Sequence, residues 1–265
     1  MLARSAQLSY YFLLALFPLL VFLVTLLGYF AQEGSQLRNS LLNYLGTVMP
    51  YSAITLVHST LDEISSGGGG GKLSFSLLAA LWVASSGMGA ISDTLNVAYD
   101  ARETRSWWRV RLVSIGLTVG LTILIMAALL IVLYGGRIGD ALAASLGYSV
   151  LFEVAWRVVQ WPIMLIFVFL TFELIYYFAP NLPHRRWRWL TPGGMVAVVL
   201  WLLISFGLRF YLHFFNSYSR TYGSLGALIV LMLWFYLTGM AVLLGGEINS
   251  EIEGAPLVED ALKKE

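Results

Sequence analysis

The chain has 265 residues, of which 58% are hydrophobic and only 12% are charged, and its formal net charge is +1. Because a soluble domain carries about 25% charged residues, this composition predicts an integral membrane protein, and the near-neutral charge gives no reason to expect a nucleic-acid partner. Cysteine is absent, which excludes disulfide scaffolds and cysteine-ligated metal sites.

Long apolar runs follow one another along the chain, each close to the roughly 20 residues that a membrane-spanning helix requires. The last run is the clearest, because Thr238 is the only polar side chain between Leu225 and Gly245, and its hydroxyl can bond back to its own helix. The sequence therefore predicts an all-α, polytopic membrane protein with one membrane domain over residues 1–265. The six predicted transmembrane helices are 8–30, 73–95, 110–134, 156–178, 192–215 and 225–247.

Prolines and glycines mark breaks in these runs. Pro18 lies in the middle of the first span and Pro162 near the start of the fourth, where each frees a backbone carbonyl and predicts a kink. Gly223 and Gly226 stand at the start of the last span, after a predicted polar turn at residues 216–222.

The segments between the spans differ in character. Residues 35–66 have apolar positions at helical spacing but no uncharged stretch long enough to cross, which predicts two amphipathic helices on the outer side. Gly67 to Gly71 is predicted to be a flexible link, since Lys72 lacks the flanking residues of a phosphate-binding loop. Residues 135–149 are predicted to be a polar connection.

The distribution of Lys and Arg residues predicts the orientation of the chain in the membrane. With six spans, the two termini and the two loops on their side carry 10 Lys and Arg residues, against 5 on the other side. Both termini are therefore predicted to face the cytoplasm. Three spans followed by three of opposite orientation suggest a 3+3 inverted repeat, for which Trp82-x-x-x-Ser86 and Trp201-x-x-x-Ser205 are the visible similarity; a true repeat and its absence both remain open.

Polar groups within the spans are the candidate site. Glu173 lies five residues before Phe178, roughly 8–10 Å inside the membrane boundary at ~1.5 Å per residue. A carboxyl group at that depth has to face protein or water, and it marks either a pathway or a structural partner. We expect it to line a polar cavity that opens to the cytoplasm. The other candidate cavity or pathway residues are Ser85, Ser86, Gly89, Asn96, Arg102, Glu247 and Asn249.

Two alternatives accompany these candidates. Glu247 and Asn249 at the inner end of the last span are expected to pair with Arg102 or Arg105, as a gate or as a salt bridge at a helix end. Glu173 could equally be a structural group that bonds to a neighbouring helix.

Four stretches together resemble the YihY/BrkB family of bacterial inner-membrane proteins. They are Leu8 to Pro18, Leu95 to Arg111, Tyr177-Phe-Ala-Pro-Asn181, and Tyr222-Gly-Ser-Leu-Gly226 through Asn249. The resemblance implies a six-helix protein of the inner membrane. Members of the family have carried a ribonuclease label, and the virulence-factor name links others to envelope resistance.

The ribonuclease label is not supported by the residues. Metal-dependent hydrolysis of a phosphodiester needs clustered carboxylates or histidines, and the three histidines lie far apart, at positions 58, 184 and 213. We therefore expect no enzyme, no metal and no cofactor.

The leading hypothesis is transport or translocation of an envelope-related solute, either lipid-like or a small anion, through a cavity between the helices. The expected partners are membrane lipids and such a solute, with no nucleic acid. A non-transporting scaffold of the cell envelope is the main alternative, and a membrane-embedded hydrolase is a weaker one.

Overall fold

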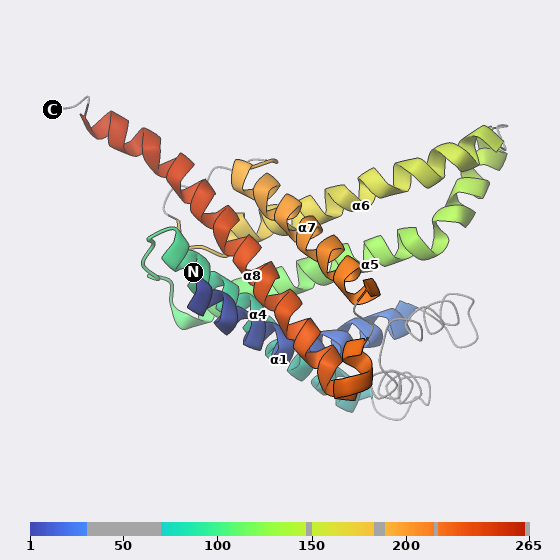
Figure 1. The fold of residues 1–265 in the computed structure, drawn as a ribbon, viewed down its shortest axis with the longest axis horizontal. Helices are drawn as coiled ribbons and strands as arrows, with labels where there is room; N and C mark the ends of the chain where they lie inside the picture. Colours follow the sequence, from blue (N-terminus) through green and yellow to red (C-terminus); the bar gives the residue numbers. More distant parts are fainter. Residues whose placement is uncertain (31–69, 147–149, 183–188, 215–216, 263–265) are drawn as a thin grey trace. The chain divides into compact units, whose positions relative to one another are not determined.

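A computed structural model describes residues 1–30, 70–146, 150–182, 189–214 and 217–262, and these are helical apart from short connections (Figure 1). The all-α class is confirmed for this part of the chain. The predicted amphipathic helices at 35–66 lie outside the described residues. The helices are α1 (Leu2–Phe30), α4 (Gly70–Ala98), α5 (Trp107–Leu146), α6 (Val150–Phe178), α7 (Pro192–Phe214) and α8 (Ser217–Leu262).

Four segments of the described residues are long and apolar enough to cross a membrane. They are Trp107–Ile131, Val158–Phe178, Pro192–Leu212 and Leu228–Ile252. These segments fall on the third to sixth predicted spans, so a polytopic membrane protein is confirmed. The first two predicted spans lie within α1 and α4, and their crossing of the membrane stays a prediction.

Several helices run further than the sequence predicted. The polar connection predicted at 135–149 is helical up to Leu146, because α5 continues through Gly135 and Gly136; its role as a connection between spans stays a prediction. The residues that follow are rich in alanine and leucine, which favour helix, and this preference outweighs the cost of the two glycines.

The start of the last helix was also misplaced. The predicted turn at 216–222 is wrong from Ser217 onward, since α8 begins there and contains both Gly223 and Gly226 in its interior. Neither glycine therefore makes a turn. Likewise, Gly70 and Gly71 belong to α4 rather than to a flexible link.

The chain divides into two compact units. Unit 1 comprises residues 1–15, 85–117 and 168–265, and unit 2 comprises residues 16–84 and 118–167. In unit 2, Pro18 lies inside α1 and Pro162 inside α6, as predicted for their positions; a kink at either stays a prediction. The prediction of a single membrane domain stays one as well.

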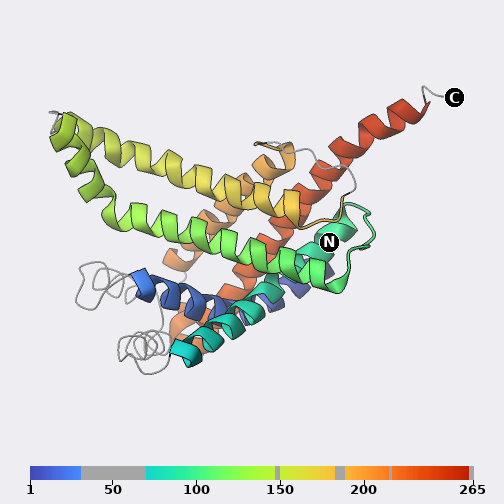
Figure 2. The ribbon, with the colours of Figure 1, turned by 180° about the vertical axis from the view of Figure 1, so that it is seen from behind.

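In unit 1, α7 packs along α8, and Figure 2 shows the two helices lying side by side. Their closest approach is made by glycine. A Cβ atom on Gly193 would collide with the carbonyl oxygen of Gly245, and one on Gly245 would meet Ala197 Cβ at 2.8 Å. Because only a residue without a side chain fits at this crossing, these glycines fix where α7 and α8 meet.

Candidate functional site: two polar clusters in unit 1

The first cluster joins three helices through one threonine. Thr191, directly before α7, donates its backbone N–H to Glu173 Oε1 at 2.8 Å, and its hydroxyl lies 2.9 Å from the same oxygen. Asn249 of α8 places Nδ2 3.0 Å from Thr191 Oγ1 and accepts the N–H of Gly193 at 2.8 Å. We call Glu173, Thr191, Gly193, Gly194 and Asn249 the Thr191 junction.

The direction of each hydrogen bond in the junction follows from counting donors. A threonine hydroxyl has one proton and two lone pairs. The N–H of Gly194 and the Asn249 amide both donate to Thr191 Oγ1, at 3.0 Å each, which fills the lone pairs. The hydroxyl proton therefore points to Glu173, whose Oε1 accepts two bonds. The carboxyl group thus serves as the acceptor that holds the start of α7 against α6.

Local sequence explains why α7 begins here. Thr191 is the N-cap residue, its side chain accepting the N–H of Gly194 three positions on, which is the usual way to satisfy a free donor at a helix start. Pro192 follows at the first helical position, where it needs no N–H partner. A Cβ on Gly194 would collide with Glu173 Oε1, so glycine there lets the carboxyl reach the threonine.

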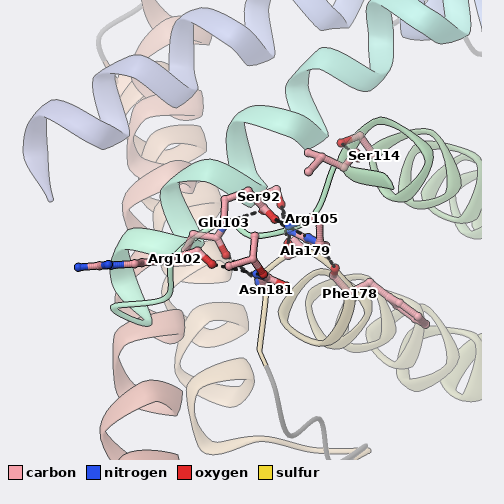
Figure 3. Close-up of polar contacts among 11 residues, drawn as sticks. Ser92, Arg102, Glu103, Arg105, Ser114, Phe178, Ala179 and Asn181 are labelled. Atoms are coloured by element: carbon pink, nitrogen blue, oxygen red, sulfur yellow. Dashed lines mark hydrogen bonds and ion pairs between the residues drawn. The ribbon is translucent and has the colours of Figure 1, made fainter. Parts of the chain in front are cut away.

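The second cluster is built around Arg105, in the connection between α4 and α5 (Figure 3). Its guanidinium donates to Glu103 Oε2 at 2.6 Å, to the carbonyl of Ala179 at 2.9 Å and to Ser92 Oγ at 3.1 Å. A cation on the last carbonyls of a helix completes groups that the helix itself leaves open. Arg105 therefore ties the C-terminal end of α6 to α4.

Two asparagines extend this cluster. Asn96 Nδ2 donates to Glu103 Oε2 at 2.9 Å, and Asn96 Oδ1 accepts the N–H of Asn181 at 2.7 Å. Asn181 in turn donates to the carbonyl of Arg102 and to Thr104 Oγ1, at 2.8 Å each. We call Ser92, Asn96, Glu103, Arg105 and Asn181 the Arg105 clamp. Their hydrogen bonds join three parts of the chain: α4, the α4–α5 connection and the segment that follows α6.

The α4–α5 connection starts with a defined turn. Ala101 N–H donates to the Asn96 carbonyl at 2.7 Å and Asp100 N–H to the Val97 carbonyl at 3.2 Å, which is the Schellman pattern of a helix end. Asp100 has φ 48°, in the left-handed region that glycine usually occupies. This turn directs the chain so that Glu103 and Arg105 reach back to α4.

The electrostatics of the Arg105 clamp favour an ionised Glu103. The hydrogen bond from the Arg105 side chain is the largest influence and lowers the pKa of Glu103 from its ordinary 4.5 to about 2, with smaller contributions from the Arg105 N–H and Asn96. Partial burial acts in the opposite direction. The salt bridge is therefore intact across neutral pH.

Other buried hydroxyls of unit 1 are bonded within their own helix. Thr94 Oγ1 donates to the Ala90 carbonyl at 2.8 Å, and Ser114 Oγ to the Val110 carbonyl at 2.9 Å. A hydroxyl can be buried in this way without a partner on another helix. The hydroxyl of Thr238 can in principle bond to its own helix, but its Oγ1 is buried without a hydrogen-bond partner among the described residues.

The structure brings together only some of the candidate residues. Glu173 is 2% exposed, which confirms that it faces protein, and Thr191 links it to Asn249. Asn96 belongs to the Arg105 clamp. Whether any of them lines a cavity stays a prediction.

The remaining candidates lie elsewhere. Ser85 is fully buried, Ser86 accepts a hydrogen bond from Arg111 at 3.4 Å, and Gly89 faces Ser114. Arg102 and Glu247 are exposed.

The proposed pairing of Asn249 with Arg102 or Arg105 is wrong. Arg105 binds Glu103, and Asn249 bonds to the start of α7 instead. The reason is reach: Glu103 is only two residues away from Arg105 and accepts from both its backbone and its side chain.

Sequence reasoning missed Thr191, Gly193, Gly194, Gly245 and Ser92. The signal for the first three was present as Thr-Pro-Gly-Gly at 191–194, a helix cap followed by two residues that permit close approach. A second glycine pair, Gly245-Gly246, is its counterpart on α8. Neither pair reveals its partner without the structure.

No group of three or more His, Cys, Asp or Glu residues suited to a metal ion occurs among the described residues. His58 and His184 lie outside them. The expectation of no metal and no enzymatic activity stays a prediction.

Comparison with known proteins gives a consistent family. The chain is 41% identical over 248 residues to YfkH of Bacillus subtilis (strain 168), a protein named as ribonuclease-like, covering 94% of this chain and 88% of that protein. It is 32% identical over 111 residues to UPF0761 membrane proteins of Xanthomonas campestris pv. campestris (strain B100) and Xanthomonas axonopodis pv. citri (strain 306), covering 42% of this chain but 25% of each relative. No solved structure matches the chain significantly. The family described as Virulence factor BrkB matches residues 1–265, and the chain therefore belongs to the BrkB family.

Proposed function

We propose that this protein moves an envelope-related solute, lipid-like or a small anion, across the bacterial inner membrane between its helices. The observation that carries the proposal is the Thr191 junction, where a buried carboxyl group is bonded to Thr191 before α7, and Thr191 is bonded in turn to Asn249 of α8. Ionisable groups inside a membrane protein are expensive, and their usual roles are in pathways for ions and substrates. A scaffold that only anchored other proteins could fill the same space with apolar side chains.

The hydrogen-bond pattern supports a moving element at this place. Glycine contacts and side-chain hydrogen bonds help to hold the start of α7. Such an element can be displaced by exchanging a small number of hydrogen bonds, which suits a gate at the end of a pathway.

The test is flux in proteoliposomes that contain the full chain. Fluorescent phospholipid accessible to an added quencher reports a lipid-like substrate, and an anion-sensitive dye inside the vesicles reports a small anion. Glu173→Gln keeps the shape and one acceptor oxygen, so it should fold while flux falls. Glu251→Gln, at an exposed carboxyl of α8, is the matched control and should keep full flux.

The outcomes separate the alternatives. Equal flux in Glu173→Gln and wild type would remove Glu173 from the mechanism. Vesicles in which neither probe moves above the protein-free rate would favour the scaffold. Mass spectrometry of lipids and solutes that co-purify with the protein would identify the substrate class.

The proposal includes six spans with both termini in the cytoplasm. Support comes from the lengths of α1 and α4, 29 residues each, and from the 10 to 5 distribution of Lys and Arg. Because the chain has no cysteine, single cysteines at positions 72, 102 and 186 can be labelled by an impermeant maleimide. Position 72 should label from outside and the other two from inside; cytoplasmic labelling at 72 would overturn the span assignment.

A further inference from the structure

The first turns of α5 carry an exposed stripe made of Trp108, Arg109, Leu112 and Gly116. Leu112 follows Trp108 by four residues and Arg109 by three, and Gly116 comes four residues later, so all four share one face of the helix. Trp108 is 64% and Leu112 is 65% exposed. A Cβ on Gly116 would meet nothing within 4 Å among the described residues. We call these four residues the α5 stripe.

The stripe combines an aromatic side chain suited to the membrane interface, a cation and an exposed apolar surface. The rings of Trp107 and Trp108 pack edge to face with centroids 4.6 Å apart, and exposed tryptophan is typical of the membrane–water interface. Gly116 has no side chain, so the helix surface one turn after Leu112 is open among the described residues. The apolar surface of Leu112 therefore follows the Trp108 indole along the same face of the helix.

Arg109 supplies the charge. It is exposed, and its guanidinium has no hydrogen bond or ion pair with any described residue. The nearest carboxylate along the chain, Glu103, is held by Arg105 at 2.6 Å. A guanidinium that has no partner among the described residues and lies beside an interfacial aromatic favours a phosphate group, which it can bind through two parallel hydrogen bonds.

We propose that the α5 stripe binds one anionic phospholipid, with Arg109 on the headgroup phosphate, Trp108 at the glycerol level and an acyl chain along Leu112 and Gly116. Charge complementarity selects an anionic lipid over a zwitterionic one, because the latter brings its own cation next to the phosphate. The inference does not depend on transport and holds for a scaffold equally.

The experiment is native mass spectrometry of the purified full chain in detergent, titrated with dioleoylphosphatidylglycerol. Wild type should bind the first dioleoylphosphatidylglycerol molecule more tightly than it binds dioleoylphosphatidylcholine. Arg109→Gln should weaken the first phosphatidylglycerol about fivefold, the effect of one cation near an anionic lipid surface, and Arg109→Lys should keep most of the affinity. Trp108→Ala should also weaken it.

Arg4→Gln is the matched control. It removes the same charge from an exposed position of α1, where Arg4 donates to Gln7 Oε1 at 3.2 Å. It should bind phosphatidylglycerol as wild type does. Equal loss in Arg4→Gln and Arg109→Gln would overturn the site in favour of non-specific attraction. Competition by glycerol 3-phosphate at the same concentration as the lipid would overturn the role of the acyl chain.

Discussion

Glu173 and Thr191 lie 18 residues apart, and the N–H and hydroxyl of Thr191 both donate to one oxygen, Glu173 Oε1, at 2.8 and 2.9 Å. The carboxyl group therefore completes the cap of the next helix. This relationship links the stability of α7's start to a buried acidic residue.

Replacing Thr191 with valine should lower the free energy of unfolding by about 2–4 kcal/mol, because Glu173, Gly194 and Asn249 each lose a buried partner. The measurement is denaturant-induced unfolding in detergent micelles. Thr238→Val is the matched control: its hydroxyl has no partner among the described residues, so it should stay within about 0.5 kcal/mol of wild type. Equal effects at the two positions would contradict the junction.

The crossing of α7 and α8 makes a second prediction. Gly193→Ala should cost about 3 kcal/mol, because the new methyl group would collide with the Gly245 backbone. Gly207→Ala lies in the same helix with nothing within 4 Å of its Cβ, and should gain up to about 1 kcal/mol from helix propensity. Thermal unfolding of both variants in one detergent tests whether the two substitutions change stability in opposite directions. A neutral Gly193→Ala would mean that α7 and α8 are not in contact there.

The sequence predicted helices and membrane insertion well because both depend on local composition. Apolar length placed the cores of α5 to α8, and Pro192 was correctly taken as the start of α7. The ends of the helices were predicted less accurately, as at Leu146 and Ser217. At these ends the residues favour helix by their backbone propensity, whereas their polar character suggests a loop.

The partners of polar residues could not be predicted in the same way. Glu173 was identified as buried from its depth alone, yet its bond to Thr191 depends on how α6 and α7 meet. The shared membrane side suggests Arg102 or Arg105 as a partner for the inner end of α8, whereas Arg105 donates to Glu103, two residues away. Knowing the side of the membrane limits the residues that can pair with Arg105. The short distance along the loop to Glu103 then determines which of them does.

Asp100 offers a test of the turn after α4. Its φ of 48° strains any residue with a Cβ atom. Asp100→Gly should therefore raise stability by about 0.5–1 kcal/mol, and Asp100→Ala should lower it by a similar amount, since alanine lacks the polar side chain that helps aspartate tolerate this conformation. Chemical unfolding of the pair is the measurement; stabilisation by alanine as well would show that charge, rather than backbone strain, is the cause.

The Glu103–Arg105 salt bridge predicts an acid dependence. Because the hydrogen bond from Arg105 lowers the pKa of Glu103 from 4.5 to about 2, the folded state holds this proton more weakly than the unfolded chain does. The stability that the pair contributes is therefore fully present above pH 4.5 and is lost as the pH falls through about 2. Unfolding of wild type followed from pH 6 to about pH 2 should include this loss.

Two variants isolate that contribution. Glu103→Gln removes the titrating group, so the wild-type minus variant difference should shrink as the pH falls below 4.5. Arg105→Gln removes the largest cause of the shift, so Glu103 should titrate closer to its ordinary value and the same fall in stability should be absent. If the wild-type minus Glu103→Gln difference stays constant between pH 6 and about pH 2, the salt bridge does not couple to folding. The Arg105 clamp would then hold α6 through the Ala179 carbonyl and Ser92 alone.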